Sequence, residues 1–233
     1  MYEDMDNKIK VSIVGGSGYT GIELLRLLSL HPNIEIHHVT SRNDAGRYVS
    51  EVYPSLRGVL RHKFVNPDEI NLKESNMVFF ATPNGVAMRY AKELINNGTK
   101  VIDLAADFRI KDIKEWEQWY EMQHQCPDLL EKAVYGLPEI NREKIKNAEL
   151  IANPGCYPTA IQLALIPLLK EGLIDPLSII ADAKSGISGA GKKNQADLLM
   201  SEASENFKAY SLMGHRHKPE IEENLTQNSP LGK

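Results

Sequence analysis

A glycine-rich turn near the amino terminus constrains the fold of this 233-residue chain more than any other feature. Residues 9–14 (IKVSIV) are rich in β-branched side chains, as in a buried strand, and GGSGYTG follows at residues 15–21. From Gly16 onward the segment has the G-x-G-x-x-G spacing that lays a pyrophosphate against a helix amino terminus. An ordinary tight turn between strand and helix would use the same glycines. Because a strand pattern precedes the turn and a helix pattern follows it, we expect a dinucleotide site here.

The same alternation of strand and helix patterns continues along the chain. It predicts an α/β fold with a doubly wound parallel sheet of the Rossmann type. We expect further strands at residues 34–42, 62–65, 76–82, 99–105, 149–153 and 177–186. We expect helices at residues 21–32, 84–97 and 112–123 and from Tyr157 onward, with a turn at 135–141.

These patterns divide the chain into two domains. We predict a dinucleotide-binding domain over residues 1–153 and a second, α+β domain for substrate and catalysis over 154–233. The helix that follows Tyr157 is apolar on nearly every side, which predicts that it is buried between layers. Residues 225–233 (LTQNSPLGK) are polar and contain Pro and Gly, so we expect an unstructured end.

Composition excludes several other classes of protein. The net charge of −4, with Lys and Arg scattered along the chain, gives no basic surface for nucleic acid. The amino terminus, MYEDMDNKIK, is acidic and lacks a long apolar stretch, so we expect neither a signal peptide nor a membrane anchor. Two cysteines, Cys126 and Cys156, are too few for a disulfide framework. A reducing cytoplasm therefore fits best.

The end of the second expected strand indicates which dinucleotide binds. An NAD site places an Asp or Glu there for the ribose 2′-hydroxyl, but this chain has Thr40, Ser41 and Arg42. An Arg side chain can pair with phosphate oxygens through two parallel hydrogen bonds, which suits a 2′-phosphate. NADP is therefore favoured over NAD. The alternative is a solvated Arg in a surface loop.

Cys156 is the candidate nucleophile. It stands in NPGCYP (residues 153–158), at the start of the apolar helix, with Pro158 placed for the first turn. Unpaired N–H groups and the helix dipole at such a position stabilise a thiolate that can attack an acyl carbon. The alternative is a small buried core residue. Cys126 lies in a polar stretch and receives no role.

A nucleophile of this kind needs a proton acceptor and donor, and GHRHKPE (residues 214–220) offers His215 and His217 near Glu220. Only one histidine need be catalytic, and a loop histidine can also be merely solvated. A zinc site is the competing interpretation of these residues. No cysteine pair and no second histidine pair stands at ligand spacing, so we expect no metal.

Together these segments resemble the N-acetyl-γ-glutamyl-phosphate reductases of arginine biosynthesis, which are related to aspartate-semialdehyde dehydrogenase. The resemblance runs from about residue 9 to residue 225. It is carried by GGSGYTG, TSR, DLAADFR, YGLPEIN, NPGCYPTA, DAKSGISGAG and GHRHKPEI, in the family's order. It implies an NADP-dependent oxidoreductase that reduces an acyl phosphate to an aldehyde through a thioester.

The resemblance also implies a set of site residues. It assigns the thioester to Cys156, acid/base catalysis to one histidine of GHRHKPEI, for which we choose His217, and the orientation of that histidine to Glu220. The expected cofactor contacts are Gly15, Gly16, Ser17, Gly18, Tyr19, Thr20, Gly21, Ser41, Arg42, Pro83 and Gly186. The related reductases of aminoadipyl or aspartyl phosphates, and a non-catalytic NADP-binding homologue, remain alternatives.

Two basic residues are candidate anchors for the substrate. Arg109 could bind a carboxylate or phosphate, and Lys192 could do so together with backbone N–H groups of its glycine-rich loop. Arg109 could equally form a structural ion pair with Asp107 or Asp112. We expect a small-molecule substrate and a homo-oligomer. Family members are longer, so we expect this chain to be a shortened product or a fragment, with an incomplete second domain.

Overall fold

The computed structural model describes residues 8–230 and is built around one seven-stranded sheet. The strand order is β3-β2-β1-β4-β5-β7-β6, and every neighbouring pair is parallel. The strands are β1 (Ile9–Val14), β2 (Ile34–Thr40), β3 (Phe64–Val65), β4 (Met77–Phe80), β5 (Lys100–Asp103), β6 (Val134–Tyr135) and β7 (Leu150–Ala152). The predicted doubly wound sheet is confirmed. Because β1 pairs with both β2 and β4, the order reverses at β1, and ligands of such sheets bind beyond the carboxyl ends of the strands there.

Helices cover both faces of the sheet. They are α1 (Tyr19–Leu28), α2 (Val49–Val52), α3 (Ala87–Asn96), α4 (Ile113–Tyr120), α5 (Pro138–Asn147), α6 (Cys156–Lys170), α7 (Met200–Ala203) and α8 (Lys218–Gln227). Ile13 packs in a core cluster with Leu25 of α1, whereas its neighbour Val14 packs in another with residues of α3 and α4. Successive strand residues point to opposite faces, so this split shows that each face has its own apolar core.

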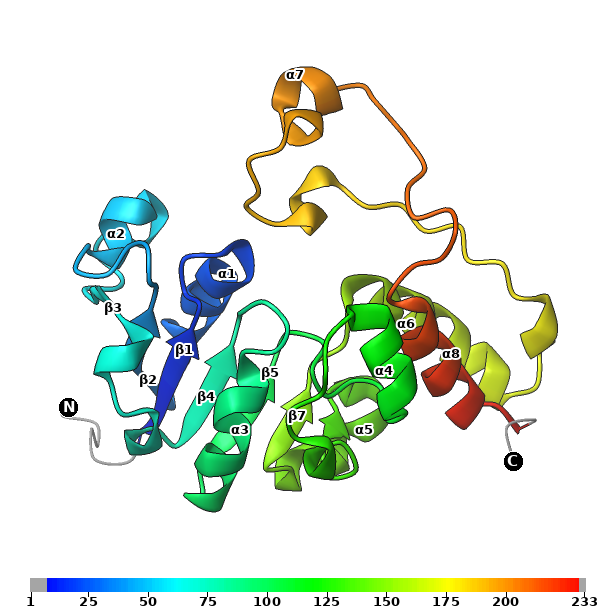
Figure 1. Cartoon of the computed structure of the whole chain (residues 1–233), viewed down its shortest axis with the longest axis horizontal. Helices are drawn as coiled ribbons and strands as arrows, with labels where there is room; N and C mark the ends of the chain where they lie inside the picture. The colour runs from blue at the N-terminus through cyan, green and yellow to red at the C-terminus, as the bar shows by residue number, and fades with distance from the viewer. Residues whose placement is uncertain (1–7, 231–233) are drawn as a thin grey trace.

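Beyond β7, helices α6 and α8 lie side by side (Figure 1). Ile166 and Leu169 of α6 are buried together with Leu225 of α8. The expected unstructured end from residue 225 is therefore wrong at its beginning, because α8 continues to Gln227; residues 231–233 lie outside the described residues. Burial of α6 between layers is also wrong, since Leu163 and Leu168 on its other face are 41% and 39% exposed.

Residues 171–216 connect α6 to α8 without adding to the sheet. Figure 1 shows this yellow-to-orange segment running far from the strands, with α7 near its tip. The strand expected at 177–186 is wrong: Leu177 and Ile180 are 94% and 92% exposed, and no described strand pairs with them. A strand needs a hydrogen-bonding neighbour, which apolar composition alone does not supply.

Two shorter expectations have mixed outcomes. The strand expected at 62–65 is confirmed as the two-residue β3. The turn expected at 135–141 is wrong, because Tyr135 ends β6 and α5 begins at Pro138, a favoured first helical residue. Among residues 8–230, no helix is both long and apolar enough to cross a membrane.

Candidate active site

The glycine turn lies at the carboxyl end of β1, where the strand order reverses. Gly15 has φ +88°, and a Cβ atom there would lie 2.4 Å from the carbonyl oxygen of Ala81. Gly21 allows equally close packing, since its Cβ would lie 2.5 Å from the Gly15 oxygen. Helix α1 starts at Tyr19, and its N-cap, Gly18, provides no side-chain hydrogen bond. Backbone N–H groups at this end of α1 thus meet no capping side chain, which fits the pyrophosphate of a dinucleotide.

Residues at the end of β2 pack against this turn. The Ser17 and Ser41 hydroxyls are 2.8 Å apart, and the Thr40 hydroxyl accepts a hydrogen bond from Gly15 N–H at 3.2 Å. The Tyr53 hydroxyl donates to the Ser17 carbonyl at 2.5 Å. The segments 15–21 and 40–42, which the sequence analysis joined only by motif, are therefore adjacent.

Arg42 has a partner that sequence reading missed. Its guanidinium donates two hydrogen bonds to Asp68, at 2.5 and 3.0 Å. These bonds raise the pKa of Arg42 and lower the pKa of Asp68. Both side chains are more than half exposed, so the pair can open at small cost. A 2′-phosphate would have to compete with Asp68 for this guanidinium.

Three other expected contacts are more scattered. Pro83 follows β4 in the loop that begins with Ala81, the residue in contact with Gly15. Gly186 precedes a 3₁₀ turn in the exposed segment 171–216. The Lys192 ammonium lies 5.3 Å from the centre of the Tyr53 ring, which places it beside the glycine turn.

Cys156 is the first residue of α6 and its thiol is exposed. The preceding Gly155 is the N-cap and offers no side chain to cap the helix. Cys126 is buried instead, and burial raises its pKa to about 12. Of the two thiols, Cys156 is the one that a substrate could reach.

His217 lies against the residue before Cys156. A Cβ on Gly155 would come within 2.8 Å of the His217 Nε2 atom and 2.9 Å of an Arg109 Nη1 atom, so only glycine leaves room for both. Burial, with help from Arg109, His215 and Arg216, lowers the pKa of His217 to about 3. The ring is therefore neutral near pH 7, so one of its two nitrogens has a free lone pair.

Glu220 is fully buried and holds the start of α6 rather than the histidine ring. Its carboxylate accepts hydrogen bonds from Gly155 N–H at 2.9 Å, from the Tyr135 hydroxyl at 2.8 Å, and from Arg109 at 3.5 Å. The His217 Nδ1 atom is buried and has no hydrogen-bond partner among residues 8–230. Glu220 is thus linked to His217 through the first turn of α8, which both residues share, and through Gly155, which bonds to the carboxylate and lies against the ring.

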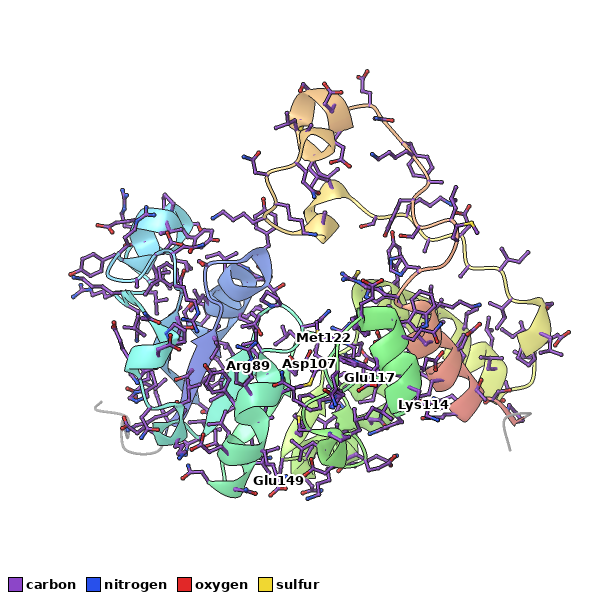
Figure 2. The ribbon with its side chains drawn as sticks, in the orientation of Figure 1. Arg89, Asp107, Lys114, Glu117, Met122 and Glu149 are labelled. Carbon is purple, nitrogen blue, oxygen red and sulfur yellow. The ribbon has the colours of Figure 1, made fainter. Side chains whose placement is uncertain are left out.

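Arg109 is buried, which limits its role as a substrate anchor. It is only 7% exposed, donates to the Leu104 carbonyl at 2.7 Å, and forms its ion pair with Glu220. From the sequence alone, Asp107 and Asp112 were the expected partners instead. Asp107, labelled in Figure 2, accepts backbone N–H bonds from Gly85 and Met88 at the start of α3. Asp112 caps α4.

Aromatic and histidine side chains gather around Tyr157, the residue after Cys156, whose ring contacts those of Tyr210, His215 and His217. His215 accepts the His217 backbone N–H at 3.1 Å, and its pKa is lowered, mainly by burial. The Tyr210 hydroxyl donates a hydrogen bond to the Tyr157 hydroxyl at 2.9 Å. Both tyrosines line a groove of about 850 Å³ between α6, α8 and residues 176–183. Sequence reading missed both tyrosines, and also Tyr135, whose only signal was its place in the quoted segment YGLPEIN.

Comparisons with known proteins indicate the family of this chain. Residues 10–148 match the family model described as "Semialdehyde dehydrogenase, NAD binding domain", and residues 156–231 match "Semialdehyde dehydrogenase, dimerisation domain". The chain is 59% identical over 217 residues to the N-acetyl-gamma-glutamyl-phosphate reductase of Thiobacillus denitrificans, covering 93% of this chain and 64% of that protein. It is 60% identical to the enzyme of the same name from Polynucleobacter asymbioticus, covering 93% of this chain and 63% of that protein.

The chain therefore spans less than two thirds of the length of these relatives. Among solved structures, aspartate semialdehyde dehydrogenase II from Vibrio cholerae shares the fold, with a TM-score of 0.52 and 19% identity. That match covers 69% of this chain and 46% of the other.

Proposed function

The chain belongs to the semialdehyde dehydrogenase family, and from that premise we propose that it takes part in NADPH-dependent reduction of N-acetyl-γ-glutamyl phosphate. The products are N-acetylglutamate 5-semialdehyde and phosphate, in arginine biosynthesis. One observation carries the proposal: the exposed thiol of Cys156 starts α6 directly after Gly155, against which the neutral ring of His217 packs. A nucleophile beside a base is what covalent acyl transfer requires.

The residues support a two-stage reaction. His217 takes the thiol proton, and Cys156 Sγ bonds to the acyl carbon while the carbon–oxygen bond to phosphate breaks, which leaves a thioester and free phosphate. NADPH, when bound, would supply the hydride that reduces the thioester carbon. The protonated His217 then gives its proton to the oxygen that develops negative charge. Collapse of the thiohemiacetal releases the aldehyde and returns the thiol.

The cofactor residues support NADP as the dinucleotide. The turn of Gly15, Gly16, Ser17, Gly18, Tyr19, Thr20 and Gly21 would hold the pyrophosphate, and Ser41 and Arg42 would hold the 2′-phosphate. In this proposal Arg42 leaves Asp68 when the phosphate arrives. Pro83 and Gly186 complete the proposed contacts.

The groove lined by Tyr157, the residue after Cys156, supports a small-molecule substrate, because its volume of about 850 Å³ is that of a ligand pocket. Lys192 stays a proposed substrate contact, although it lies by Tyr53. Arg109 is better described as a positioning residue for Glu220. The nearest alternatives are reduction of aminoadipyl or aspartyl phosphate, or NADP binding without catalysis.

The domain division and the setting are also proposals. We place a nucleotide domain at residues 1–153 and a catalytic domain at 154–233, since β7 ends at Ala152 and the two family models match on either side of residues 149–155. The dimerisation-domain match supports a homo-oligomer. A cytoplasmic location would keep Cys126 and Cys156 reduced, as both are free thiols here.

The test is Cys156→Ser with Cys126→Ser as its matched control. Without the thiol no thioester can form, so we expect turnover to fall by at least about a thousandfold while NADPH affinity is unchanged. The assay is NADP reduction with N-acetylglutamate semialdehyde and phosphate, run beside aspartate semialdehyde. Residual Cys156→Ser activity within tenfold of the parent would refute the covalent mechanism. NADPH binding with no turnover in the parent would favour the non-catalytic alternative.

A further inference from the structure

The first turn of α8 is tied to the start of α6 by a short chain of buried hydrogen bonds. The Glu220 Oε1 atom accepts two of them, from Gly155 N–H at 2.9 Å and from the Tyr135 hydroxyl at 2.8 Å. The Gln162 amide in turn donates to the Tyr135 hydroxyl at 3.0 Å. The chain therefore joins β6, α6 and α8 around one carboxylate.

Two neighbours attract that carboxylate in different directions, the N–H of Gly155 and the guanidinium of Arg109. Arg109 lies on the other side of Glu220 and reaches it at only 3.5 Å, a long contact for an ion pair between two buried side chains. A charged guanidinium attracts a carboxylate more strongly than a neutral amide does. The Tyr135 hydroxyl is the additional donor that keeps the Oε1 atom directed toward Gly155.

The burial of the tyrosine supports this account. Burial and the negative charge of Glu220 both raise the pKa of Tyr135, so its hydroxyl keeps its proton and can serve only as the donor in that hydrogen bond. Gln162 is fully buried and occupies the acceptor side of the same oxygen. The orientation of the hydroxyl is thereby fixed.

Glu220 connects these bonds to the proposed chemistry. It lies one helical turn from His217, the N-cap of α8, and it holds Gly155, the N-cap of the helix that begins with Cys156. We propose that Tyr135 is a positioning residue: its hydroxyl holds Glu220 between the two helix starts and so aligns the His217 ring with the Cys156 thiol. This inference rests on the proposed function, and it assigns a role to a residue that touches neither the thiol nor the imidazole.

The test uses alkylation of Cys156, because it reports the thiol directly and does not require the complete reaction. Tyr135→Phe removes only the hydroxyl. The matched control is Tyr120→Phe, since Tyr120 is also buried but its hydroxyl has no hydrogen-bond partner in the described part of the chain. Iodoacetamide labelling of the whole chain is followed by mass spectrometry, which separates Cys156 from Cys126.

We expect Tyr135→Phe to slow labelling of Cys156 by about tenfold, as misplacement of a base by a fraction of an ångström does. Tyr120→Phe should stay within about twofold of the parent. In a His217→Asn background, Tyr135→Phe should change the rate by less than about twofold, because the alignment it protects is already lost. Gln162→Met, which leaves the tyrosine in place, should give a smaller loss of about threefold.

The outcomes separate the positioning role of Tyr135 from the proposed function. Suppose that Cys156 is labelled faster than Cys126 in the parent, but at equal rates in Tyr135→Phe and Tyr120→Phe. That result would overturn the positioning role alone. An undiminished effect of Tyr135→Phe in the His217→Asn background would also overturn it, because a general loosening of the fold needs no histidine. Equal labelling of Cys126 and Cys156 in the parent would overturn the proposed function and the positioning role together.

Discussion

Residues 9–153 and residues 171–216 contain similar apolar side chains but use them differently. In the first region, Ile13, Phe80 and Val101 are fully buried in two clusters, one on each face of the sheet. In the second region no residue is buried, and the side chains of Leu177 and Met213 are almost wholly exposed. Figure 2 shows the side chains of this second region projecting from a ribbon that lies far from the sheet.

Strand pairing, rather than apolar composition, therefore determines which segments form the core. Residues 177–180 (LSII) are as apolar as the strands β1 and β4, yet β1 has a strand on each side and the LSII segment pairs with no strand of the described residues. Each paired strand forms its backbone hydrogen bonds with its neighbours, so both of its faces can be buried by side chains. We therefore expect stability to come from residues 9–153 and little of it from 171–216.

The largest expected effect tests that division directly. Phe80→Ala removes a fully buried ring and should lower the free energy of unfolding by about 3–5 kcal/mol. Phe207→Ala, at a site 78% exposed, should change it by less than about 0.5 kcal/mol. Urea denaturation measures both. A comparable loss at Phe207 would show that residues 171–216 are packed in solution, which would contradict the difference between the two regions.

The packing of Gly21 tests how rigidly residues 9–153 hold the glycine turn at 15–21. Gly21→Ala would place a Cβ 2.5 Å from a backbone oxygen, so the turn must shift, and we expect NADPH affinity to fall about a hundredfold. Arg26→Ala is the control, because this exposed residue lies in the last turn of the same helix, away from the glycine turn. Calorimetric titration should show Arg26→Ala within about threefold of the parent. Equal losses in Gly21→Ala and Arg26→Ala would mean that close packing at Gly21 does not set the turn.

The third prediction concerns His217, where the exposed segment rejoins the fold. Its pKa is lowered to about 3, whereas an unfolded histidine titrates near about 6.5, so between these values the unfolded chain binds a proton that the native chain does not. Stability must therefore fall as pH falls through this window, by about 2 kcal/mol at pH 5 from this residue. His217→Asn should remove that part of the slope in denaturation curves from pH 7 to pH 4.

The exposed His31→Asn serves as the control for this measurement. Identical pH slopes for the parent and His217→Asn would place His217 in solvent, with residues 171–216 rather than with the core.

The smallest expected effect lies in the choice between NADPH and NADH. Arg42→Asp should lower the NADPH preference by about tenfold, because a carboxylate repels the 2′-phosphate and accepts from a 2′-hydroxyl. Asp68→Asn should raise NADPH affinity by about twofold, since it weakens the competing pair with Arg42. Paired titrations with both cofactors measure this. An unchanged ratio in Arg42→Asp would show that Arg42 does not touch the phosphate.

Local signals could be predicted from the sequence, and distant partnerships could not. The glycine turn and the placement of Cys156 at a helix start follow from what a few adjacent residues allow, and the structure has both. Asp68 as the partner of Arg42, and Gly155 as that of Glu220, depend on chain segments 26 and 65 residues apart. Nothing in the local pattern of Arg109 distinguishes Asp107, two residues away, from Glu220, 111 residues away.

The carboxylate of Glu220 also imposes an order in time on the making of this protein. Its partners Gly155 and Tyr135 precede it by 65 and 85 residues, so they leave the ribosome well before it does. Until Glu220 emerges, the N–H of Gly155 and the hydroxyl proton of Tyr135 lack their native acceptor. The sheet can thus assemble before the surroundings of the thiol are complete, because those surroundings wait for a residue that is synthesised well after β7.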